Sequence, residues 1–78
     1  MSFKSEFSKD VFHARDDRGW TQQYTADRLS IPKRTYQNIE LGRTSPRLAT
    51  FVKLVLLFKL NIEDYRESLG IKLLDDDK

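Results

Sequence analysis

The sequence predicts an all-α fold, a compact bundle of five short helices, and three observations lead to this prediction. Apolar residues recur every three or four positions over most of the chain, which is the spacing of one face of an α-helix. Glycine, proline or asparagine separates these segments at short intervals, as is typical of helix ends. The chain has 78 residues and no cysteine, so it fits one domain without disulfides or thiolate metal sites.

The first helix is expected over residues 5–17 and is followed by Gly19, a common residue just past a helix end. Its apolar face is formed by Phe3, Phe7, Val11 and Ala14. Thr21 is a suitable cap for the second helix, expected over residues 22–29, because its hydroxyl can accept a hydrogen bond from a first-turn N–H. The side chains expected on the buried side of this helix are Tyr24, Thr25, Ala26 and Leu29.

Pro32 indicates the start of a third helix, expected over residues 32–41, because proline fits the first helical position. Gly42 is expected to end it. The inward residues of this helix are expected to be Tyr36 and Ile39, with Tyr36 in the core rather than stacked on a base. In the loop that follows, Ser45 is a candidate cap for the next helix.

The fourth helix, expected over residues 47–60, carries more apolar side chains than one core needs. Its inward face is formed by Phe51, Leu54, Val55 and Phe58. The surplus residues on other faces are Val52, Leu56 and Leu57. Such a surplus in a small protein is typical of an interface, so we expect a homodimer. The alternative is a cover within the monomer, formed by Leu69, Ile71, Leu73 and Leu74.

A short fifth helix is expected over residues 62–69, between Asn61 and Gly70. We therefore expect residues 1–70 to form one domain and residues 71–78 to form a C-terminal tail that can contribute to the dimer interface.

Charge is unevenly distributed along the chain, although the net charge is only +2. Residues 28–47 carry five basic side chains against one acidic, whereas residues 61–78 carry three basic against six acidic. A basic middle with an acidic end predicts one surface that meets a polyanion. The alternative is a basic loop that is merely solvated.

Several functional classes find no support in the composition. His13 is the one histidine and there is no cysteine, so we expect no metal site and no cofactor. Asp16 and Asp17 are neighbours on a helix and point in different directions, without a nucleophile beside them, so we expect no enzyme. The N-terminus lacks the apolar run of a signal peptide, and the longest apolar run, residues 54–58, is far below the roughly 20 residues of a membrane span. We expect a cytoplasmic protein without membrane contact.

The outward face of the third helix has the chemistry of a base-reading surface. It carries Lys33, Arg34, Gln37 and Asn38. Arginine and lysine donate to guanine O6 and N7, and glutamine and asparagine pair with adenine N6 and N7. A major groove about 12 Å wide admits one such helix. Two short helices joined by a tight turn allow the second to protrude, so double-stranded DNA is the expected partner.

The chain resembles the phage-repressor and Cro class of helix-turn-helix proteins, the XRE family. The resemblance rests on residues 15–29, Ile31 and residues 39–42, and it continues through Pro46, Phe51, Leu54, Val55, Phe58 and Leu60. It covers residues 7–65 and implies a lambda-repressor-like domain with a scaffold helix over 22–29 and a recognition helix over 32–41.

The resemblance also implies roles for individual residues. Base contacts are implied for Lys33, Arg34 and Asn38, with Gln37 next. Contacts with the DNA backbone are implied for Thr21, Gln22, Arg43, Thr44 and Arg47. An ion pair that ties the first helix to the recognition helix is implied for Arg15 and Glu40.

Two positions depart from the family pattern. Ser30 stands where the turn between the helices usually has glycine, and a left-handed backbone there costs serine about 1 kcal/mol; alternatively, Pro32 reshapes the turn. Thr25 stands where leucine is preferred, which allows a small rotation of the scaffold helix.

Together these observations predict a sequence-specific transcriptional regulator that binds a palindromic operator as a homodimer. The size suits a phage or mobile-element repressor or a restriction-modification controller, acting by operator occupancy or by contact with RNA polymerase. The alternative is an antitoxin-like interaction module that uses the same fold to bind a toxin partner.

Overall fold

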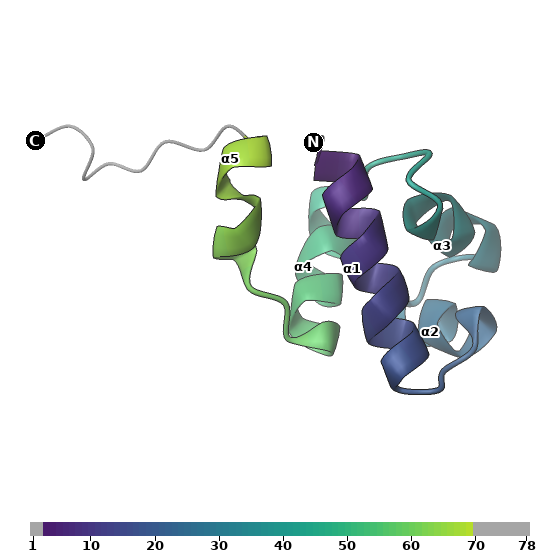
Figure 1. Cartoon of the computed structure of the whole chain (residues 1–78). Coiled ribbons are helices and arrows are strands. Elements are labelled where there is room, and N and C mark those ends of the chain that lie inside the picture. The colour runs from purple at the N-terminus through teal and green to yellow at the C-terminus, as the bar shows by residue number, and fades with distance from the viewer. Residues whose placement is uncertain (1–2, 70–78) are drawn as a thin grey trace, which may run out of the picture.

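The computed structural model describes residues 3–69 as an all-α domain (Figure 1). Its helices are α1 (Phe3–Asp17), α2 (Gln22–Leu29), α3 (Lys33–Glu40), α4 (Leu48–Phe58) and α5 (Arg66–Leu69), with a 3-10 turn, η1 (Ile62–Tyr65), before α5. Residues 3–69 contain no β-strand. The predicted fold class is therefore confirmed, and the predicted tail, residues 71–78, lies outside the described residues.

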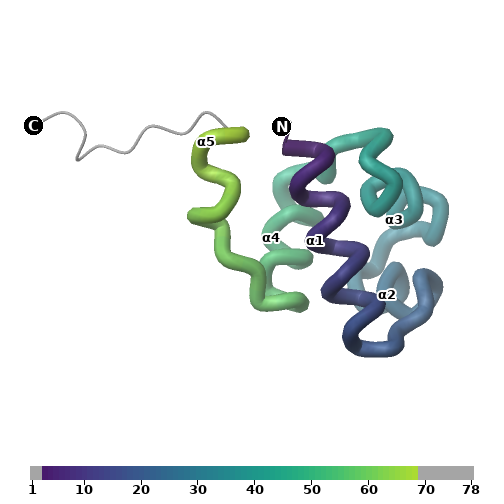
Figure 2. Tube along the Cα trace, in the orientation of Figure 1, coloured from purple at the N-terminus to yellow at the C-terminus, as the bar shows by residue number. Residues whose placement is uncertain are grey.

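The helices surround one apolar core. The tube in Figure 2 shows α1 running across the middle of the molecule, with α2 and α3 on one side and α5 on the other. Helix α3 packs against both α1 and α2, and α4 packs against α1 and α2. The buried core side chains are Phe7, Val11, Ala26, Leu29, Tyr36, Ile39, Leu54, Phe58 and Tyr65. The core thus includes side chains from α1, α2, α3, α4 and η1.

The inward faces agree with the predictions at most positions. Tyr36 is fully buried, and Trp20 packs partly buried against the core. The prediction for Tyr24 is wrong, because this side chain is 43% exposed. Its ring lies edge-on to Trp20, with 4.9 Å between the ring centroids, and its hydroxyl accepts a hydrogen bond from Arg28 Nη1 at 3.0 Å. Thr25 and Ala26 take the inward positions beside it.

The helix ends show which capping predictions hold. Helix α2 has the predicted bounds, and Thr21 Oγ1 accepts a hydrogen bond from the Tyr24 N–H at 3.0 Å. Pro32 is the N-cap of α3 rather than its first residue, with φ −62° and ψ 147°. Ser45 does not cap α4: Arg47 is the N-cap, and its side chain makes no capping hydrogen bond.

The region after α4 differs from the prediction. Helix α4 ends at Phe58 instead of Leu60, because Lys59 turns to φ 55° in the left-handed region and its N–H bonds Val55 O. Asn61 then caps η1, where its side chain accepts a hydrogen bond from the Glu63 N–H at 3.0 Å. The first half of the predicted fifth helix is therefore a 3-10 turn.

Ser30 adopts the left-handed conformation that the family pattern assigns to glycine. Its φ is 59° and its ψ is 42°, and its N–H bonds the carbonyls of Ala26 and Asp27. The turn is thus kept in its glycine-type geometry at a cost of about 1 kcal/mol for a residue with a Cβ. This turn sets the position of α3 relative to α2.

Candidate nucleic-acid interface

Helix α3 has one face in the core and one face outside it. Tyr36 is 0% exposed and Ile39 is 2% exposed, so they anchor the helix. Lys33 and Arg34 are exposed at its N-terminal end, and Gln37 and Asn38 are half-buried on the following turn. These four predicted base-contact residues therefore lie away from the buried face, and Lys33 and Arg34 form no ion pair with residues 3–69.

Arg15 and Glu40, the predicted ion pair, lie in contact and link α1 to the end of α3. Arg15 Nε donates to Glu40 Oε2 at 2.7 Å and Arg15 Nη2 donates to Glu40 Oε1 at 3.1 Å. The two side chains are 14% and 5% exposed. Arg15 Nη1 also donates to the carbonyl of Trp20 at 2.7 Å, so one guanidinium joins α1, the α1–α2 loop and α3.

Glu40 accepts two further hydrogen bonds that the sequence did not reveal. The Tyr36 hydroxyl donates to Oε2 at 2.6 Å and Gln22 Nε2 donates to Oε1 at 2.8 Å. With the two bonds from Arg15, each carboxylate oxygen accepts two hydrogen bonds, which matches the capacity of a carboxylate. Burial would raise the pKa of Glu40, but the donors Arg15, Tyr36 and Gln22 outweigh it and hold that pKa below its ordinary value.

The same contacts raise the pKa values of Arg15 and Tyr36, the two ionisable partners of Glu40. The hydrogen bond from Arg15 to Glu40 raises the pKa of Arg15 above its ordinary value. Burial and the hydrogen bond to Glu40 raise the pKa of the Tyr36 hydroxyl. The group is therefore a charged pair with a neutral phenol donor at neutral pH, and it holds α3 in one orientation.

Gln22 and Gln37 extend this network to the outer face. Gln37 Nε2 donates to Gln22 Oε1 at 3.0 Å, while Gln22 Nε2 is engaged with Glu40. Gln22 was predicted to contact a phosphate and Gln37 to contact a base, and the structure brings the two amides together. No sequence pattern signals this pair, because the two residues lie on different helices 15 positions apart.

The predicted backbone-contact residues flank α3 on both sides. Thr21 is exposed at the N-terminus of α2, and Arg43, Thr44 and Arg47 are exposed in the segment between α3 and α4. The N–H groups of Arg43 and Thr44 bond the Asn38 carbonyl at 2.9 and 3.4 Å, which folds this segment back over the end of α3. Two exposed basic side chains, Arg43 and Arg47, therefore follow the C-terminal end of α3.

An apolar stripe follows the outside of α4. Val52 and Leu56, both predicted at a dimer interface, are 45% and 72% exposed, and Leu48 lies on the same stripe with 78% exposed. Leu48 was not among the predicted interface residues, although the spacing of four residues places it in line with the other two. Leu57 lies elsewhere: it is partly buried and packs against the core.

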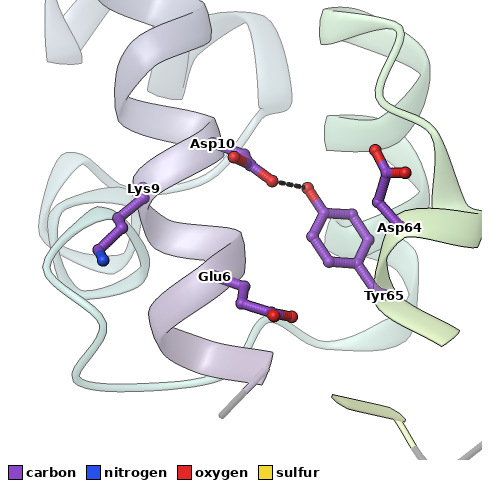
Figure 3. Close-up of a pocket in the computed structure, with 5 residues that line it drawn as sticks. All are labelled: Glu6, Lys9, Asp10, Asp64 and Tyr65. Carbon is purple, nitrogen blue, oxygen red and sulfur yellow. Dashed lines mark hydrogen bonds between the residues drawn. The ribbon is translucent and has the colours of Figure 1, made fainter. Parts of the chain in front are cut away.

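A hollow of about 250 Å³ lies between α1 and η1 (Figure 3). It is lined by Glu6, Lys9, Asp10, Asp64 and Tyr65. The Tyr65 hydroxyl donates to Asp10 Oδ2 at 2.5 Å. Burial is the main cause that raises the pKa of Tyr65, and this hydrogen bond raises it further. Within residues 3–69 no three His, Cys, Asp or Glu residues are placed to hold a metal ion. The contact fastens the C-terminal turn to α1.

Comparison with known proteins assigns this chain to a family. Among the described helices, none combines the length and the apolar character needed to cross a bilayer. No curated protein and no solved structure matches the chain significantly. A family model described as helix-turn-helix matches residues 13–65, which is more than half of the chain and includes α2, the turn and α3. The chain therefore belongs to the XRE family of helix-turn-helix proteins, a family of DNA-binding regulators that is not normally enzymatic.

Proposed function

We propose that this protein is a sequence-specific transcriptional regulator that binds a palindromic operator as a homodimer in the cytoplasm. Its role would be that of a phage or mobile-element repressor or of a restriction-modification controller. One observation carries the proposal. The outward residues of α3 are polar and basic, while the hydrogen bonds that Glu40 accepts tie the same helix to α1 and α2. A rigid helix with free donors on its outer face is what base reading in a major groove requires.

The proposal assigns two kinds of contact. Lys33, Arg34, Gln37 and Asn38 face base edges, where guanidinium and ammonium groups suit guanine and amides suit adenine. Thr21, Gln22, Arg43, Thr44 and Arg47 face the phosphates. The N-terminus of α2 supports this second role, since its free N–H groups and positive dipole end attract an anion. Phosphate contacts supply affinity and register but carry no sequence information.

The dimer is proposed through α4. Leu48, Val52 and Leu56 form a continuous exposed apolar stripe, and a two-fold axis would place the stripe of one copy against that of another. Two recognition helices in such a dimer should lie about 34 Å apart, one turn of B-DNA, so that both enter the major groove on one side.

The test is selection of bound fragments from a pool of random duplexes, followed by a salt titration with the selected site. We expect a palindromic site and a log–log salt slope of about −0.9 for each phosphate neutralised. Absence of enrichment and of duplex affinity at moderate salt would contradict DNA binding and favour a protein-interaction role. Enrichment of a site without two-fold symmetry would contradict the dimeric arrangement alone.

A further inference from the structure

We propose that a hollow beside α3 binds a small organic anion with an apolar body, and that such a ligand competes with DNA for this protein. The hollow has a volume of about 600 Å³, which falls in the range of about 300–1,000 Å³ that is typical of small-molecule sites. Its lining comes from the turn before α3, α3 itself, the loop after α3 and the first turn of α4. Ligand binding is independent of the proposed function, whereas the competition with DNA rests on it.

One part of the lining is apolar. Its apolar residues are Ile31, Pro32, Ile39, Pro46 and Ala49. Ile39 is 2% exposed and belongs to the core, so it forms the floor of the hollow, whereas Pro32 and Ala49 are exposed at its rim. Contact with a hydrocarbon ring or chain would remove this surface from water, which favours binding.

The start of α4 supplies groups that attract an anion. The first hydrogen bond of the helix runs from the Phe51 N–H to the Arg47 carbonyl at 2.8 Å, so the N–H groups of residues 48–50 have no acceptor within the helix. No side chain of the N-cap bonds them, and the positive end of the helix dipole adds to the attraction. Arg47 lines the same hollow and forms no ion pair with residues 3–69.

Thr50 is an independent sign of a polar ligand. It lines the hollow and is only 9% exposed, yet its hydroxyl has no hydrogen-bond partner within residues 3–69. Thr25, which is also buried, instead donates to the carbonyl of Thr21 at 2.9 Å. A buried hydroxyl without a partner is costly, and an anionic oxygen in the hollow would accept its hydrogen bond.

Together these features define the chemical class of the ligand. An inorganic phosphate would satisfy the N–H groups and the hydroxyl but would leave the apolar lining in water. A wholly apolar molecule would leave the polar groups without partners. A carboxylate or phosphate on an aromatic or aliphatic body satisfies both parts. Because Thr44 and Arg47 line the hollow and are proposed to contact DNA phosphates, the bound ligand would take the place of the DNA backbone.

The first experiment measures ligand binding to the full chain without DNA, followed by the NMR signals of backbone amides. The probes are phenyl phosphate, inorganic phosphate and benzyl alcohol. We expect phenyl phosphate to shift the amide signals of residues 48–50. It should bind at least about tenfold more tightly than either other probe, because it alone contacts both parts of the lining.

Two substitutions locate this binding. We expect Ala49→Leu to weaken phenyl phosphate binding about tenfold, because the larger side chain fills the hollow. Thr50→Val should weaken it several-fold, because it removes the hydroxyl and keeps the shape of the side chain. Val52→Leu is the matched control, since Val52 is exposed on the same helix but does not line the hollow.

The second experiment measures competition on the site selected above, at constant ionic strength because salt alone weakens DNA binding. At a phenyl phosphate concentration ten times its dissociation constant, mass action predicts that DNA affinity falls about tenfold. In Ala49→Leu the same concentration should lower DNA affinity only about twofold.

The outcomes separate this inference from the proposed function. Equal affinity for phenyl phosphate and inorganic phosphate would overturn the inference, because the hollow would then hold a DNA phosphate alone. Amide signals of residues 48–50 that do not respond would also overturn it, as would an Ala49→Leu variant that binds the probe normally. DNA affinity that saturating phenyl phosphate leaves unchanged would overturn the competition. Absence of DNA binding by a protein that still binds phenyl phosphate would instead contradict the proposed function and leave the ligand site standing.

Discussion

Among the side chains of the site, Glu40 accepts the most hydrogen bonds. Its side chain is 5% exposed, yet it is charged, and four hydrogen bonds from three other side chains compensate for the lost hydration. A buried pair that loses one partner leaves an uncompensated charge, so its removal costs more than the intact pair contributes. Glu40 therefore affects both the stability of the fold and the position of α3.

We expect Glu40→Gln to lower the free energy of unfolding by about 3–5 kcal/mol at neutral pH, because it leaves the Arg15 charge without its partner. Urea denaturation measures this change. Glu63→Gln is the control, since Glu63 is 60% exposed and lies 3.8 Å from Arg66, and its effect should stay below about 1 kcal/mol. Equal effects of the two substitutions would show that burial of the Arg15–Glu40 pair does not matter.

The stability contribution of Glu40 should depend on pH with a defined sign. Its pKa in the folded protein lies below the ordinary value of 4.5, so the folded state binds its proton less readily than the unfolded chain. The difference in unfolding free energy between the wild type and Glu40→Gln should therefore be constant above pH 4.5 and shrink as the pH falls below it. A difference that grows on acidification would contradict this account.

Ser30 offers a simple gain in stability. We expect Ser30→Gly to raise the free energy of unfolding by up to about 1 kcal/mol, because glycine adopts the φ of 59° found there without a Cβ clash. Thermal denaturation followed by circular dichroism measures it. Ser45→Gly is the control, since Ser45 is exposed and has no positive φ; it should give no stabilisation, and an equal gain from both would point away from backbone strain.

At the scale of helices, the sequence predicted most of the elements that form the site. The bounds of α2 followed from the capping Thr21 and from the turn at Ser30 that the family pattern places after this helix. Both are local signals in the sequence. The end of α4 could not be predicted, because Lys59 adopts a left-handed conformation and lysine is not a residue that indicates such a helix end. The outward position of Tyr24 had no local signal either, since it depends on packing against Trp20 and Arg28.

The same distinction holds for the candidate site. The positions of Arg15 and Glu40 were predicted through the family resemblance. The hydrogen bonds of Gln22 to Glu40 and Gln37 were not, because they depend on the angle between α2 and α3. Long polar side chains on two elements have many possible partners in a sequence, and only the packed fold selects among them.

DNA binding should respond differently to the loss of an arginine on α3 and to the loss of one in the loop after it. We expect Arg34→Ala to cost about 1–3 kcal/mol on the preferred site and to relax base preference there, because a base-edge contact is lost. Arg43→Ala should weaken binding to all sequences alike and reduce the salt slope by about one phosphate. Titrations on specific and unrelated duplexes measure both. Unchanged preference in Arg34→Ala would remove that residue from the base-reading set.

At the scale of the whole molecule, the exposed apolar stripe lies on a different helix from the predicted base-contact residues. Basic side chains gather on α3 and the segment after it, while the exposed stripe of Leu48, Val52 and Leu56 belongs to α4. A dimer formed through α4 therefore leaves the basic surface of each copy free. Two such surfaces on one assembly bind one operator more tightly than either could alone, because the second contact is intramolecular.

The dimer can be tested by placing a charge on the stripe. We expect Leu56→Glu to give a folded monomer in sedimentation experiments, because Leu56 is 72% exposed and the new carboxylate would face the partner copy's apolar stripe. Affinity for the palindromic site should fall by at least tenfold, while affinity for a single half-site stays the same. Ile62→Glu is the matched control, since Ile62 is also an exposed apolar residue, at 47%, but lies on η1. A Leu56→Glu variant that remains dimeric, or a wild type that is monomeric at the concentrations that saturate the operator, would rule out α4 as the dimer surface.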